Sequence, residues 1–168
     1  MNHIQGFSSL FFIISAIKSI YVSNNKLWKA SNIFLVLSSY LCNATDYIER
    51  YLFMDHIAII GIGISYINLS ILKNIIFHII SYDYYLHGNL ENSKDTFYII
   101  AIIKSVVHTS ILTESINTLV LILSIIIGVI SINTRRSIEI KDKSIIMLLT
   151  WVWHFCMMNV LYISSITS

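Results

Sequence analysis

Long apolar stretches, separated by short polar breaks, run through the whole chain. A stretch that crosses a bilayer needs about 20 mostly apolar residues, because the hydrocarbon core is about 30 Å thick. Backbone polar groups find no water at that depth, so each such stretch must be helical. We therefore expect an all-α fold, with residues 1–168 forming one integral membrane domain, a multi-pass transmembrane bundle of six or seven helices. The apolar stretches cover residues 6–22, 27–44, 51–72, 75–85, 96–112, 116–132 and 144–163.

The number of spans depends on Lys73 and Asn74, which interrupt the apolar pattern in the middle of the chain. A turn at this point gives seven spans, two of them short, whereas a continuous helix over residues 51–81 gives six. Short spans suit a thin bilayer such as that of the endoplasmic reticulum, so we expect the endoplasmic reticulum or another host endomembrane. Residues 1–5 contain no Lys or Arg, which favours a retained first span over a cleaved signal peptide.

The distribution of basic residues predicts an orientation. Cytoplasmic loops are enriched in Lys and Arg, and basic residues gather around the first and the last polar breaks. Both breaks are then expected on the cytoplasmic side, which fits six spans, because seven spans put them on opposite sides. The basic residues are Lys18, Lys26 and Lys29 at the first break and Arg135, Arg136, Lys141 and Lys143 at the last.

Composition supports a membrane location and excludes several soluble classes. Hydrophobic residues make up 56% of the chain and charged residues 12%, about half of the charged fraction in ordinary soluble domains. The net charge of +2 is too small for a nucleic-acid-binding protein. Isoleucine accounts for about a fifth of the residues, which indicates an AT-rich genome. We find no phosphate-binding glycine loop, nucleophile elbow or paired-cysteine metal motif.

Several ionisable side chains lie within the apolar stretches, where charge is costly and often functional. Lys104 and His108 are four residues apart and therefore share a helical face. They are candidates for a proton or substrate site, although interhelical hydrogen bonds or a snorkelling lysine explain them more simply. His78, His108 and His154 are a conceivable zinc-binding set, but their spacing does not require one.

One set of short motifs carries a family resemblance. Ser39 and Asn43 lie in the segment Ser-Tyr-Leu-Cys-Asn-Ala-Thr that ends the second span, and Asp55 lies near the start of the third. Trp153 and His154 lie in the last span. This arrangement resembles the CREST superfamily of membrane hydrolases and receptors, which includes alkaline ceramidases, progestin and adipoQ receptors, GPI-remodelling lipases and the myomaker group.

The resemblance implies a seven-span fold and a zinc site, but two expected ligands are replaced. In the superfamily the second span carries Ser-x-x-x-His and the last carries His-x-x-x-His, whereas this chain has Asn43 and Thr150 at two of the three histidine positions. Ser39 and Asp55 match the residues that assist hydrolysis, and His154 matches the remaining ligand. Amide and hydroxyl groups bind zinc poorly, so the resemblance implies a member that has lost its metal site. Cys42 and Asp46 are the nearby side chains that could substitute as ligands.

Three functions follow from these observations. The first is a non-catalytic membrane protein of undetermined biochemical role, CREST-like and divergent, that binds membrane lipid or other transmembrane helices and uses no cofactor. The second is a zinc-dependent lipid amide hydrolase, resembling ceramidases, that uses Ser39, Asp55 and His154. The third is a small transporter or channel that depends on Lys104 and His108.

Overall fold

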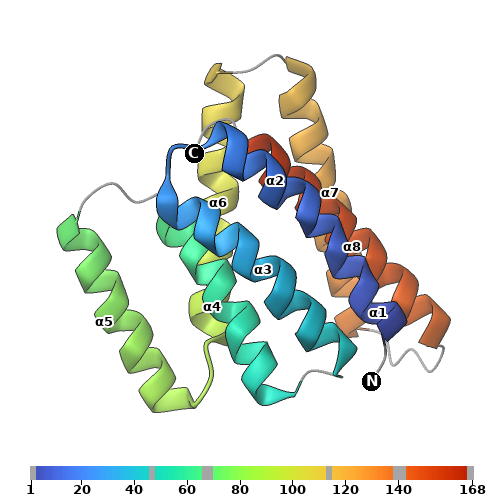
Figure 1. The fold of residues 1–168 in the computed structure, drawn as a ribbon, viewed down its shortest axis with the longest axis horizontal. Coiled ribbons are helices and arrows are strands. Elements are labelled where there is room, and N and C mark those ends of the chain that lie inside the picture. Colours follow the sequence, from blue (N-terminus) through green and yellow to red (C-terminus); the bar gives the residue numbers. More distant parts are fainter. Residues whose placement is uncertain (1–2, 46–47, 66–69, 113–114, 138–142, 166–168) are drawn as a thin grey trace.

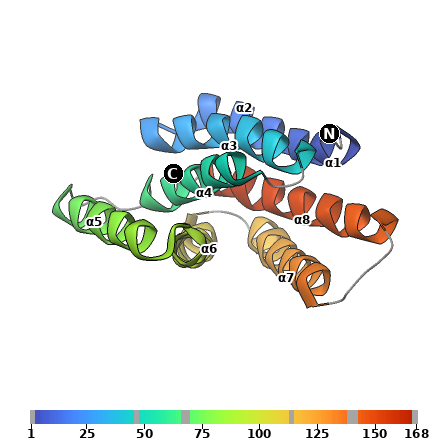
Figure 2. The same ribbon diagram turned by 90° about the horizontal axis from the view of Figure 1, so that it is seen from below.

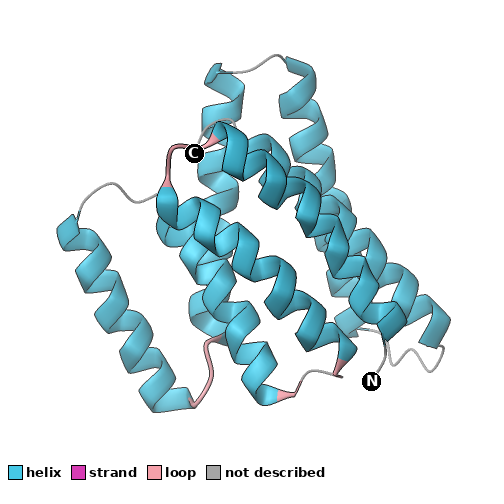
Figure 3. Ribbon diagram, in the orientation of Figure 1, coloured by secondary structure: helices cyan, strands magenta, loops and turns pink. Residues whose placement is uncertain are grey.

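A computed structural model describes residues 3–45, 48–65, 70–112, 115–137 and 143–165, and every regular element within them is helical (Figure 3). The first rod is nearly continuous, because the 3₁₀ turn η1 joins two α-helices end to end. The elements are α1 (His3–Phe7), η1 (Ser8–Phe11), α2 (Phe12–Val22), α3 (Lys26–Ala44), α4 (Glu49–Ser65), α5 (Ser70–His87), α6 (Glu91–Leu112), α7 (Ser115–Ser137) and α8 (Lys143–Ser164).

The helix ends follow local chemistry. α3 begins after Asn25, whose side-chain oxygen accepts a hydrogen bond from the backbone N–H of Trp28 at 3.1 Å, the usual role of an N-cap residue. α5 ends at His87 and is followed by Gly88, which has a positive φ of 65°. The N–H of Gly88 bonds to the Tyr84 carbonyl at 2.8 Å. Glycine adopts this left-handed conformation without strain, so it can close a helix here.

The helices form three layers (Figure 2). The first rod and α3 make one outer layer, α4 and α8 lie in the middle, and α5, α6 and α7 make the other outer layer. α7 packs along α8 and α3 packs along α4, whereas α5 touches the remainder of the bundle least (Figure 1). The middle layer therefore carries most of the packing.

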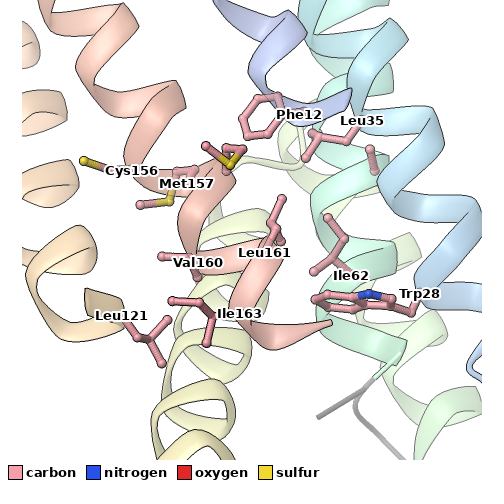
Figure 4. Packing of buried hydrophobic residues seen from close by; sticks show 12 residues of the cluster. Phe12, Trp28, Leu35, Ile62, Leu121, Cys156, Met157, Val160, Leu161 and Ile163 are labelled. Atoms are coloured by element: carbon pink, nitrogen blue, oxygen red, sulfur yellow. The ribbon is translucent and has the colours of Figure 1, made fainter. Parts of the chain in front are cut away.

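Side chains from several helices form the main apolar core (Figure 4). Trp28 and Leu121 are fully buried, and Met157 of α8 lies between the layers with 1% exposure. Two glycines allow the middle layer to approach its neighbours. A Cβ atom on Gly63 would lie 2.6 Å from Cβ of Phe97 on α6, and one on Gly61 would meet the Ser31 hydroxyl of α3. Glycine, which has no Cβ atom, thus permits close approach on two sides of α4.

The outer surface is rich in apolar side chains. Three helical segments in the described part of the chain are long and apolar enough to cross a membrane: His3–Val22, Ile116–Arg135 and Lys143–Ser164. The exposed face of the second consists of branched aliphatic residues, a surface suited to lipid and not to water. Its exposed side chains include Ile116, Leu119, Val120, Ile122, Leu123, Ile126, Ile127, Val129 and Ile130.

The polar break that we expected at Lys73 and Asn74 does not coincide with the end of a helix. Lys73 and Asn74 lie inside α5, and α4 and α5 are two separate helices, so residues 51–81 are not one helix. A lysine within a helix can extend its ammonium group away from apolar surroundings, which is why this residue did not mark a turn. The C-terminal end of α2 and the N-terminal end of α8 lie at opposite ends of the bundle (Figure 1), whereas the charge pattern predicted that the first and last breaks lie on the same side.

Candidate functional site

A cavity of about 620 Å³ opens between α3, α4, α6, α7 and α8. Ser39 and Asn43 of α3, Asp55 of α4 and His154 of α8 all line it. These residues come together because consecutive rods run in opposite directions, which places the end of α3, the start of α4 and the middle of α8 at similar depth (Figure 1). The cavity volume falls in the range of small-molecule sites, about 300–1,000 Å³.

The α3 wall of the cavity is a hydrogen-bonded pair one helical turn apart. The Asn43 side-chain nitrogen donates to the backbone carbonyl of Ser39 at 2.8 Å. The same nitrogen lies 3.4 Å from the Ser39 hydroxyl and 3.4 Å from the Ser9 hydroxyl of the first rod. Ser9 and Ser39 are also in contact, with their hydroxyl oxygens 3.1 Å apart. Asn43 therefore anchors a cluster of hydroxyl groups at the α3 wall of the cavity.

Asp55 completes this cluster from α4. Its carboxyl group lies close to the Ser39 hydroxyl. The Oδ1 atom is buried and has no hydrogen-bond partner among the described residues. A buried acceptor without a partner costs about 1–3 kcal/mol, so this oxygen has unused capacity to accept a bond.

His154 is held by the first rod. Its Nδ1 atom lies 2.6 Å from the Ser8 hydroxyl, and the Ser8 hydroxyl donates to the backbone carbonyl of Gln5 at 2.8 Å. The ring of Phe12 packs against the imidazole with centroids 5.3 Å apart. These contacts fix the orientation of the ring, and they engage Nδ1 while Nε2 remains available to the cavity that His154 lines.

The cavity lining includes both charged and apolar side chains. Lys94 and Asp95 at the start of α6 line the cavity, with Nζ and Oδ1 3.5 Å apart and the Lys94 side chain 11% exposed, and Arg135 at the end of α7 is part of the same lining. Deeper in the bundle, a small cavity of about 20 Å³ lies against Trp28 and Met157. The two cavities share the lining residues Leu35, Ile59, Tyr98 and Ile102. The site is therefore amphipathic along the bundle axis.

The residues present do not fit the zinc ion that the family resemblance implies. The Thr150 hydroxyl bonds to the backbone carbonyl of Ile146 at 2.9 Å, within its own helix, and Asn43 donates to hydroxyls and a carbonyl. Within the described ranges no group of three His, Cys, Asp or Glu side chains could hold a metal ion. Cys42 is buried on α3 and does not line the cavity, and Asp46 lies outside the described residues.

The other polar residues singled out from the sequence lie elsewhere. Lys104 is half-buried on α6 and does not line the large cavity, and the side chain of His108 lies outside the described part of the structure. His78 is exposed on α5 and does not share the cavity of His154. The zinc set of His78, His108 and His154 thus gains no support from the described side chains.

Ser8 and Ser9 are the site residues that sequence reasoning missed. Serines in apolar helices commonly bond to a preceding carbonyl, as Ser15 and Ser19 do here, so most of them indicate no site. Ser8 also bonds to a preceding carbonyl, but the adjacent pair of fully buried serines in addition contacts two different helices, α8 and α3. An uninterrupted Ser-Ser pair within an apolar stretch was the available signal.

No family model, curated protein or solved structure matches the chain. The resemblance drawn from the short motifs thus remains an expectation, and what can be said about the site depends on the geometry above.

Proposed function

We propose that this chain is a multi-pass integral membrane protein, a divergent CREST-like bundle without the zinc site, that binds a membrane lipid in the cavity between α3, α4, α6, α7 and α8. The observation that carries the proposal is the meeting of Ser39, Asp55 and His154 in the lining of one cavity. These residues come from three helices, and they are the ones that match the motifs of that superfamily.

A lipid is the ligand that suits the surroundings of this cavity. The outer surface of the bundle is apolar, so the molecules that reach it from the side are lipids. The cavity walls combine aliphatic residues such as Leu35 and Ile59 with a polar cluster around Asp55. An amphiphile can place its chain against the former and its headgroup against the latter.

A non-catalytic role fits the chemistry of the polar cluster. Zinc-dependent hydrolysis needs a metal held by three protein ligands that activates water, and Asn43 and Thr150 occupy two of the three corresponding positions. The alternative, an active zinc-dependent lipid amide hydrolase, draws on the same meeting of Ser39, Asp55 and His154. Metal content of the purified protein separates the two: stoichiometric zinc that is lost on His154→Ala supports the hydrolase.

The binding proposal is tested with a photoreactive lipid. The full chain is reconstituted in phosphatidylcholine nanodiscs and exposed to a diazirine-bearing monoacylglycerol. Ile59 lines both cavities, so Ile59→Trp should fill the site and lower labelling severalfold. Ile57 lies two residues away on the same helix with 38% exposure, which makes Ile57→Trp the matched control. Equal labelling of the two variants would contradict lipid binding in this cavity.

A further inference from the structure

The hydrogen bonds of Ser8 determine which ring nitrogen of His154 carries a proton. Ser8 donates its proton to the Gln5 carbonyl, so the 2.6 Å contact between Ser8 and His154 requires Nδ1 of the imidazole to be the donor. A neutral histidine with a proton on Nδ1 has a lone pair on Nε2. His154 therefore presents an acceptor to the cavity.

A second polar cluster lies next to Asp55. The Asn43 side-chain nitrogen donates to the Ser39 carbonyl and lies 3.4 Å from the Ser9 hydroxyl, and the Ser9 and Ser39 hydroxyl oxygens are 3.1 Å apart. The donors of Asn43 are thus used within this cluster.

Two hydrogen-bond acceptors in the cavity lining receive no donor in the contacts described above. Nε2 of His154 is one, and the Asp55 carboxylate, with its unpartnered Oδ1, is the other. A carboxylate or phosphate headgroup would bring further lone pairs and negative charge to these atoms, which is unfavourable in a site of low dielectric. A hydroxyl or ammonium headgroup would supply the donors that both atoms lack.

Acidic residues accompany the basic ones in the cavity lining. Lys94, whose side chain is 11% exposed, lies 3.5 Å from Asp95, and Glu91 lines the same cavity as Arg135. Because Glu91 and Asp95 offset Lys94 and Arg135, the lining does not form the unopposed cluster of cations that phosphate recognition uses.

We propose that the cavity selects amphiphiles whose headgroup donates hydrogen bonds, a hydroxyl or a primary amine, to Asp55 and to Nε2 of His154, and that it disfavours anionic headgroups. This inference rests on the proposed lipid-binding function and adds the chemical class of the ligand. Asp55 and His154 are the specificity-determining residues, and Ser8 is the positioning residue that sets the histidine tautomer.

Three ligands of equal chain length test the selectivity. Saturable binding of radiolabelled monolauroylglycerol, dodecylamine and dodecyl phosphate is measured on the full chain in phosphatidylcholine nanodiscs, with empty nanodiscs as the blank. We expect the first two to bind at least about tenfold more tightly than the phosphate, the equivalent of one hydrogen bond to a charged group. A preference for the hydroxyl ligand or for the amine then identifies which donor the site uses.

Substitution of Asp55 gives a second, independent readout. Asp55→Asn keeps the side-chain shape but replaces an acceptor with a donor, so it should narrow or reverse the preference against dodecyl phosphate. Glu49→Gln, at an exposed residue of the same helix that does not line the cavity, is the matched control and should leave the ratio unchanged. Phosphate binding as tight as that of the other ligands would overturn the selectivity and leave lipid binding intact. Absence of saturable binding by all three ligands would overturn the proposed function itself.

The tautomer provides a readout that does not depend on affinity. Nitrogen-15 spectra of labelled histidine distinguish protonated from unprotonated ring nitrogens, and comparison with His154→Gln assigns the signal. We expect an unprotonated Nε2 in the free protein, shifted by monolauroylglycerol, and a mixture of tautomers in Ser8→Ala. A proton on Nε2 in the free protein would contradict the acceptor assignment.

Discussion

The Ser8 hydroxyl lies 2.6 Å from Nδ1 of His154, a contact between residues 146 positions apart in the sequence. It ties the first rod to the last helix at the polar end of the cavity. Both residues are buried, so neither atom can exchange this partner for water. The contact therefore joins the orientation of a site residue to the packing of the whole bundle.

Removing the Ser8 hydroxyl should destabilise the protein measurably. Ser8→Ala leaves a buried histidine nitrogen without its partner, which costs about 1–3 kcal/mol. Ser15→Ala is the control, because the Ser15 hydroxyl bonds only to the carbonyl of Phe12 in its own helix and should cost little. Thermal unfolding of the two variants in the same detergent checks this difference, and equal stability would contradict the buried contact.

The approach of α4 to α6 depends on Gly63. A Cβ atom there would lie 2.6 Å from Cβ and 2.9 Å from the backbone oxygen of Phe97, so Gly63→Ala must separate two backbones. Overpacking of this kind typically costs about 1–3 kcal/mol. Gly128→Ala should cost less, because its nearest neighbour is the flexible end of Met157. The ranking of the two variants in a denaturation series tests the packing, and the opposite ranking would be inconsistent with it.

Asp83 holds α5 to the start of α6. Its Oδ2 atom accepts from the Ser93 hydroxyl at 2.6 Å and from the Ser93 backbone N–H at 3.3 Å, a capping interaction supplied by the neighbouring helix. Loss of a cap costs about 1 kcal/mol, and α5 has few other contacts with the bundle. Asp83→Ala should therefore accelerate hydrogen exchange in α5, whereas Asp95→Ala should not. Unchanged exchange in both variants would show that other contacts hold α5.

The lost metal site should be recoverable if the arrangement is CREST-like. Asn43→His together with Thr150→His restores three histidines, and we expect this variant to bind about one zinc ion per chain where the parent binds none. Asn32→His with Thr150→His is the control, because Asn32 is buried on α3 but does not line the cavity. The zinc content of each variant is measured after dialysis. Equal zinc content in both variants would argue against the superfamily arrangement.

The helices were largely predictable because their apolar length and caps are local properties. The second stretch was expected at residues 27–44 and is observed as Lys26–Ala44, with Asn25 as the capping residue. Both alternatives for the middle of the chain, a turn at Lys73 or one helix over residues 51–81, were wrong because only Lys73 and Asn74 were considered as the break. A charged residue with a long apolar stem is compatible with the interior of a membrane helix, so charge alone does not mark a turn.

The site was predictable only in part. The motifs singled out Ser39, Asp55 and His154, and the structure brings these three into the lining of one cavity. Ser8 and Ser9 contact residues 146 and 30 positions away, and their adjacency was the local signal that set them apart from Ser15. Partners set by tertiary packing are not encoded in the spacing of a single helix.

The direction in which successive rods run is the claim on which the cavity, its polar cluster and its ligand all depend. Asn24 follows α2 and Lys143 begins α8, and the C-terminal end of α2 and the N-terminal end of α8 lie at opposite ends of the bundle (Figure 1). The measurement is labelling of Asn24→Cys and Lys143→Cys, in a chain with Cys42 and Cys156 replaced by Ala, by a membrane-impermeant maleimide on sealed vesicles. We expect one variant to react from outside and the other only after the vesicles are opened. Reaction of both from the same side, as the distribution of lysines and arginines suggests, would contradict the account.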